Sequence, residues 1–156
     1  MSNWKTKAEW SLAYRVEGRK RANLRTFAPV NTLESFEETL HGVLSEIDRT
    51  LEERWGARWP LHPARPARGT AANPQYDGLF RVTASFTAGY GSKLGPGYVF
   101  RVEISTLADV PEETRAEIEE EAVRLLREGL ARAFPGRDLR VDRDGPVLKI
   151  HGDLSL

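Results

Sequence analysis

The chain has 156 residues, of which 40% are hydrophobic and 29% are charged, and it contains no cysteine. This length and apolar share favour one folded domain, residues 1–156, over a disordered or multidomain chain. The lack of cysteine excludes disulfide scaffolds, thiolate nucleophiles and cysteine zinc sites. The 23 basic and 23 acidic side chains cancel, which does not favour a nucleic-acid-binding class.

The charges are nevertheless segregated along the chain. Residues 1–30 hold seven Lys or Arg against two Glu, whereas residues 31–55 hold two Arg against seven acids. Such segregation can steer a charged partner. The alternative is that the basic N-terminal segment lies along the protein's own acidic helices.

Hydropathy along the chain gives no sign of a membrane protein. No apolar run approaches the roughly 18–20 residues that span a bilayer. Glu9 and Ser11 interrupt the stretch that would form the apolar core of a signal peptide. We therefore expect a cytoplasmic protein, and a bacterial one from its preference for Arg over Lys.

The first expected element is a strand. Trp10, Leu12, Tyr14 and Val16 alternate with polar or small residues, and a period of two is typical of a half-buried strand. A short helix over residues 7–14 is the alternative.

A long amphipathic helix is expected from Leu33 to Trp55. Its apolar residues recur with a 3.6-residue period, Asn31 and Glu34 can form a capping box, and Gly56 ends it. The remaining face carries acids that we expect to be exposed: Glu37, Glu38, Glu46, Asp48 and Glu52.

Residues 56–78 are rich in proline and arginine, and a loop of this length is often functional or disordered. Trp59, Arg65 and Arg68 interleave aromatic and cationic groups, as single-strand binders do. With Arg19, Lys20 and Arg21 they form the candidate nucleic-acid surface. The alternative is that the tryptophans close the core and the arginines keep the loop soluble.

Two alternating strands follow, at about residues 80–88 and 98–105, joined by a glycine-rich connection from Gly89 to Gly97. Phosphate cradles place such glycines between a strand and a helix N-terminus. This connection leads into a strand and its spacing fails, so a wide, mobile hairpin loop is favoured. Tyr90, Ser92 and Lys93 at its tip are the candidate contact residues.

A second helix is expected from about Val110 to Phe134, with Asp109 as N-cap and Glu112 as its partner. Its acidic run cannot converge on one metal ion, since successive helical residues point in different directions. This run includes Glu121 and is expected to be solvated. Gly129 marks a possible close approach of a neighbour.

The chain ends in an expected hairpin, with strands at 139–141 and 147–151 around an Asp144-Gly145 turn. This hairpin offers His151 and Asp153 a route to Asp142 or Asp144. Such a cluster would be a weak metal or acid/base constellation, and a surface histidine beside a turn is the more common case. No serine nucleophile motif and no Ser/Lys pair is evident in the sequence.

The pattern as a whole predicts an α+β two-layer sandwich, with two helices on one face of an antiparallel sheet. It is ferredoxin-like (βαββαβ plus an extra C-terminal strand) if the strand at residues 10–16 forms, and αββαββ otherwise. The leading functional prediction is a non-catalytic binding or assembly module with a protein partner or a second copy, and without metal or cofactor. The alternatives are nucleic-acid binding through the basic residues, and an enzyme acting on a small anionic substrate near the glycine-rich connection.

Overall fold

The computed structural model describes residues 33–155. By its contacts the chain divides into residues 1–35 and residues 36–156, and the second unit contains nearly all that is described. The strand expected at residues 10–16, the Asn31 cap and the basic segment 1–30 lie outside the described residues. The described elements are α2 (Leu33–Trp55), η1 (Pro74–Tyr76), β1 (Phe80–Thr87), β2 (Gly97–Ile104), α3 (Glu112–Ala133), β3 (Leu139–Asp144) and β4 (Val147–Gly152).

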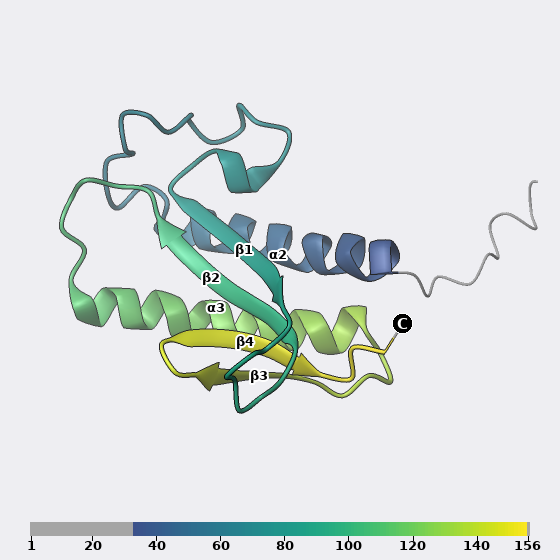
Figure 1. Ribbon diagram of the computed structural model, residues 1–156. Coiled ribbons are helices and arrows are strands. Elements are labelled where there is room, and N and C mark those ends of the chain that lie inside the picture. Colours follow the sequence, from purple (N-terminus) through teal and green to yellow (C-terminus); the bar gives the residue numbers. More distant parts are fainter. Residues whose placement is uncertain (1–32, 156) are drawn as a thin grey trace, which may run out of the picture. The chain divides into compact units, whose positions relative to one another are not determined.

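The four strands form one antiparallel sheet in the order β1-β2-β4-β3, and Figure 1 shows both helices on one side of it. The α+β prediction is confirmed, and the described elements run αββαββ. The strand that would make the order ferredoxin-like lies outside residues 33–155. The C-terminal strand lies inside the sheet. β4 lies between β2 and β3, because the hairpin turn places it beside β3 while Ile150 pairs with Tyr98.

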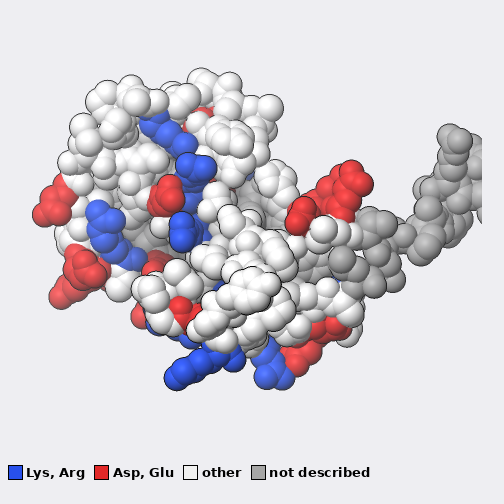
Figure 2. All heavy atoms as spheres, viewed as in Figure 1, with Lys and Arg blue, Asp and Glu red and all other residues white. Residues whose placement is uncertain are grey.

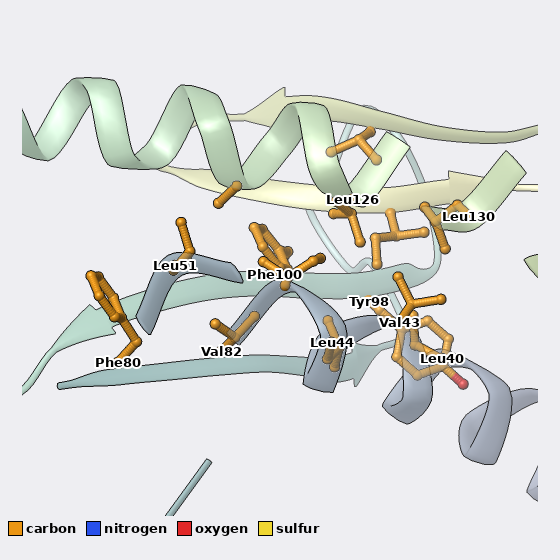
Figure 3. Packing of buried hydrophobic residues seen from close by; sticks show 14 of the residues in the cluster. Leu40, Val43, Leu44, Leu51, Phe80, Val82, Tyr98, Phe100, Leu126 and Leu130 are labelled. Atoms are coloured by element: carbon orange, nitrogen blue, oxygen red, sulfur yellow. The ribbon is translucent and has the colours of Figure 1, made fainter. Parts of the chain in front are cut away.

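The core fills the space between the sheet and the helices. Figure 3 shows Leu51, Val82 and Phe100 among the side chains that meet there. The predicted helix Leu33–Trp55 is confirmed over its full length, because its apolar period matches one buried face. On β1 and β2 the even-numbered residues point into this core, and the odd-numbered ones form the opposite, open face.

The start of α3 differs from the prediction. The helix begins at Glu112, and its N-cap is Pro111, which makes no side-chain capping hydrogen bond. The predicted Asp109 cap is therefore wrong, because the extended backbone of Pro111 (φ −55°, ψ 141°) intervenes. The close approach expected at Gly129 is confirmed, since a Cβ there would lie 2.7 Å from Val43 Cγ1.

Candidate functional site

The glycine loop, residues 88–96, is bonded to the open face of the sheet. Figure 1 shows it crossing in front of β4 and β3. The Lys149 ammonium donates to Ser92 Oγ (2.6 Å) and to the Gly95 carbonyl (2.8 Å), and Ser92 donates to Asp144 (2.5 Å). The expected mobile hairpin tip is therefore replaced by a loop tied to the sheet. We call these contacts among Ser92, Asp144 and Lys149 the lysine clasp.

The charges of Lys149 and Asp144 in the lysine clasp are paired with each other. Lys149 is only 2% exposed, and its Nζ lies 2.8 Å from Asp144 Oδ2. The hydrogen bonds from Lys149 and Ser92 hold the pKa of the Asp144 carboxyl below its usual range. An ammonium paired with an ionised carboxylate has no free electron pair with which to act as a general base. The geometry therefore supports a role in fixing the loop more than a serine–lysine dyad.

The three candidate residues of this loop are placed differently. Ser92 points inward to the lysine clasp, whereas the Tyr90 side chain is 97% exposed and Lys93 is also exposed. The loop therefore presents Tyr90 on an anchored backbone. The Ser92–Lys149 contact was not predicted, because 57 positions separate the two residues and no local pattern relates them.

The proline- and arginine-rich loop is ordered by its own arginines. Arg65 donates to the backbone carbonyls of Gln75, Asp77, Gly78 and Phe80 at 2.8–3.0 Å. Each charged hydrogen bond of this kind contributes about 1.5–3 kcal/mol. The Arg65 guanidinium is thus used within the protein.

Arg68 connects the same loop to α2. Its Nη1 lies 2.6 Å from Asp48 Oδ1 and 3.4 Å from Asp77 Oδ1, and both carboxylates are 1% exposed. Asp77 also accepts from the amides of Gly69 and Ala71. The prediction that Asp48 is solvent-exposed is wrong, because the Arg68 side chain from the loop packs against its carboxylate.

Glu52, on the same helix face, is also not fully exposed. It accepts from the Leu79 and Phe80 amides at 3.0–3.2 Å. The acidic face of α2 therefore anchors the chain that leads into β1 as well as the loop.

The remaining candidates for nucleic-acid binding are not gathered into a surface by the described part of the chain. Trp59 is half-buried against the core. Arg19, Lys20 and Arg21 lie outside the described residues. Because Arg65 and Arg68 are engaged internally, binding of nucleic acid stays a prediction without structural support.

The last hairpin does bring one histidine to a carboxylate. His151 Nε2 lies 2.7 Å from Asp142 Oδ2, across the β3–β4 pair. Within residues 33–155 there is no group of three His, Cys, Asp or Glu side chains that could hold a metal ion. The hairpin therefore supplies a pair, and the wider cluster with Asp153 is not formed there.

β1 is one of the two edge strands of the sheet, and β3 is the other. The Ser105 amide donates to the Leu79 carbonyl at 2.6 Å, which extends the β1–β2 ladder. In an antiparallel pair alternate residues bond to the neighbour, so odd-numbered residues of β1 face β2 and even-numbered ones face outward. Accordingly, the outward N–H and C=O of Phe80 bond to Glu52 and Arg65.

The other outward residues are Val82, Ala84 and Phe86. Their outward backbone groups have no partner within the described residues, since β1 ends the sheet. A hollow of about 490 Å³ borders this edge, lined by both faces of β1 and by Leu40, His41 and Leu44 of α2. Phe86 is 61% exposed there and meets Tyr98 edge-on, with ring centroids 5.6 Å apart. We call these three residues with their backbone groups the open edge.

The face of the sheet away from the helices carries charges of both signs. Figure 2 shows basic and acidic side chains interspersed over it. Arg81 and Glu103 are register partners, as are Thr83 and Arg101. Such a mixed face does not build the single-sign field that would steer a polyanion. Neither α2 nor α3 holds an apolar stretch of the kind a bilayer crossing requires.

Comparison with known proteins identifies the family of this chain. Residues 31–152 match a family model described as "Uncharacterised protein". The chain belongs to this family. A relative from Borreliella burgdorferi (strain ATCC 35210 / DSM 4680 / CIP 102532 / B31), described as "Uncharacterized protein", is 42% identical over 123 residues. This match covers 79% of the chain and 96% of the relative. No solved structure matches the chain.

The family match separates the candidate sites by position. The open edge, the lysine clasp and the proline- and arginine-rich loop all lie within the matched residues 31–152. Arg19, Lys20 and Arg21 lie before them. The open edge is thus part of the family's own domain, and the basic N-terminal segment is not part of the match.

Proposed function

We propose that this protein is a binding or assembly module that pairs its open edge with an extended strand of another polypeptide. The observation that carries this proposal is the row of unpartnered outward backbone groups on Val82, Ala84 and Phe86. Strand addition to a sheet edge supplies main-chain hydrogen bonds, and the alternate side chains then select the partner.

The position of the groups that protect the edge of β1 supports this proposal. Proteins usually protect an exposed edge with lysine, proline, a bulge or a covering segment. Here Glu52 and Arg65 cover the outward groups of Phe80, at one end of β1. The next three outward residues carry neither a charge nor a proline. The edge is closed at Phe80, where the long loop meets it, and its outward residues become more exposed from Val82 (3%) to Phe86 (61%).

The side chains beside the open edge add apolar area to the hydrogen bonds. Phe86 is even-numbered, like the core residues of β1, but it is largely exposed. An incoming strand would cover it from the edge side. Burying apolar surface contributes about 25 cal/mol per Å², so an aromatic ring at this position favours a partner with an apolar residue opposite.

The polar clusters do not compete with this proposal. In the lysine clasp each charge already has an opposite charge or a hydrogen bond, and Arg65 and Arg68 are engaged in the same way. These groups support the shape of the domain, and the open edge supplies the contact.

A selection from randomised peptides displayed on phage tests strand addition directly. We expect the full-length protein to enrich peptides with alternating apolar residues. Phe86→Lys should weaken their binding by about tenfold or more, because a desolvated charge costs at least the 1.4 kcal/mol that a tenfold change represents.

Leu107→Lys is the matched control, since Leu107 is a large apolar residue that is 73% exposed outside the sheet. It should bind the selected peptides like the unchanged protein. Selected peptides that bind Phe86→Lys undiminished, or a selection that enriches no alternating sequence, would contradict the proposal.

A further inference from the structure

We infer that the strand received by the open edge is β1 of a second copy of this chain, paired antiparallel about a two-fold axis at Ala84. This inference rests on the proposed function and names its partner. It follows from the position of the free backbone groups and from the side chains that the symmetry brings together.

The free hydrogen-bonding groups define the register. In an antiparallel pair, bonded residues lie directly opposite one another and exchange both of their hydrogen bonds. A two-fold axis at Ala84 places Ala84 opposite its own copy and Val82 opposite Phe86 of the second copy. Every free outward group of the open edge is then used, and the occupied groups of Phe80 are left outside the ladder.

Registers with the two-fold axis one residue away match the free backbone groups less well. A shift of the axis to residue 83 would bring Phe80 into a bonded pair, although its backbone groups already bond to Glu52 and Arg65. A shift to residue 85 would pair Val82 with Ala88, which follows the end of β1. The register at Ala84 is therefore the one in which all three open residues, and only these, form the ladder.

The side chains of β1 are complementary in this register. On the helix side Phe86 of each copy meets Val82 of the other, and aromatic with β-branched pairs stabilise sheets. On the open face Thr83 lies opposite Ser85, whose hydroxyls can bond. The only charge on the strand, Arg81, lies opposite Thr87, so no like charges face each other.

Because the chain contains no cysteine, an introduced cysteine can form a disulfide only with another introduced cysteine. Arg81→Cys and Thr87→Cys are prepared as separate full-length variants, mixed, allowed to exchange and oxidised. In the inferred register a Cys at 81 faces a Cys at 87 of the other copy, within the Cα separation of about 4.4–6.8 Å that a disulfide spans. Two copies of the same variant would hold their cysteines about 20 Å apart along the strands, at 3.4 Å per residue.

We expect a disulfide-linked dimer in the mixture and none above background in either variant alone, with Leu107→Cys giving the background. Sedimentation equilibrium should show that the uncrosslinked protein is a dimer, and that Phe86→Lys weakens it by about tenfold or more. Circular dichroism checks that Phe86→Lys remains folded, as we expect from the exposure of Phe86.

The outcomes separate this inference from the proposed function. A strictly monomeric protein that still binds selected peptides at the open edge overturns the second copy as partner and leaves strand addition standing. Crosslinking within a single variant overturns the register. A dimer that is unaffected by Phe86→Lys overturns the edge as its interface. Association of the open edge with a segment of its own chain would appear as a monomer with protected outward amides, and it also overturns the inference.

Discussion

The Asp48 carboxylate meets the Arg68 guanidinium at 2.6 Å, so the middle of α2 is bonded to the proline- and arginine-rich loop. Asp77 shares the same guanidinium at 3.4 Å. One cation thereby serves two carboxylates that are both 1% exposed. This contact fixes the chain just before β1, and with it the end of the open edge.

Replacing Arg68 by alanine should destabilise the fold markedly, because it leaves two buried carboxylates without their cation. Breaking a buried pair costs about 3–5 kcal/mol, and the partial exposure of Arg68 reduces this to about 2–3 kcal/mol. The midpoint of urea unfolding measures the effect. Arg49→Ala, an exposed arginine on α2, should change stability by no more than about 0.5 kcal/mol. Equal effects of the two substitutions would contradict the importance of the pair.

The pH dependence of stability should report Asp48. Burial raises the pKa of Asp48 from 3.8 to about 6. Between these values the folded protein binds the proton more tightly than the unfolded chain, so this residue's contribution to the unfolding free energy falls as pH rises from about 4 to about 6.

Asp48→Asn removes this dependence and is nearly isosteric. The stability of this variant relative to the unchanged protein should therefore rise by about 2–3 kcal/mol between pH 4 and pH 7, at about 1.4 kcal/mol per pKa unit. Chemical denaturation at a series of pH values gives the comparison, with Glu53→Gln on the exposed side of α2 as the control. A difference between Asp48→Asn and the unchanged protein that does not vary with pH would refute the shift.

The lysine clasp should be needed for the position of the glycine loop. Lys149→Met retains an unbranched buried side chain but removes the donor to Ser92 and Gly95. We expect the loop amides, including that of Leu94, to lose protection in hydrogen exchange. Lys93→Met, an exposed lysine in the same loop, should leave them unchanged. Unaltered exchange in Lys149→Met would show that the loop is held by other contacts.

Two helical glycines should respond in opposite directions to alanine. At Gly129 the new methyl group would lie 2.7 Å from Val43, and overpacking costs about 1–3 kcal/mol. At Gly42 nothing lies within 4 Å, so alanine should stabilise α2 by about 1 kcal/mol through its higher helix propensity. Thermal unfolding of both variants decides this. Stabilisation by Gly129→Ala would contradict the close approach of the two helices.

The local parts of the fold were predictable and the contacts between distant segments were not. The apolar period of α2 gave its bounds, and alternation located all four strands, because these patterns record which face is buried. The same pattern misplaced Asp48, since its partner Arg68 comes from a loop with no periodicity. It also misplaced Glu121, whose side chain is 9% exposed and bonds to Arg54 and Trp55 of α2.

The open edge was only partly predictable. Association with a protein partner or a second copy was expected, but which strand ends the sheet depends on the β2–β4 pairing. That pairing joins residues about 50 positions apart, and no local pattern encodes it. The free groups of Val82, Ala84 and Phe86 follow only from the sheet order, and the strand pattern gave no sign that Phe86 is 61% exposed.

Residue-resolved amide exchange as a function of protein concentration tests the central claim most directly. The amides of Val82, Ala84 and Phe86 should become protected as concentration rises, because β1 of a second copy then accepts their hydrogen bonds. The inward amides of Thr83 and Ser85 should be protected at every concentration, since they face β2. Outward amides that exchange equally fast at all concentrations, in a protein that stays monomeric, would contradict assembly through this edge.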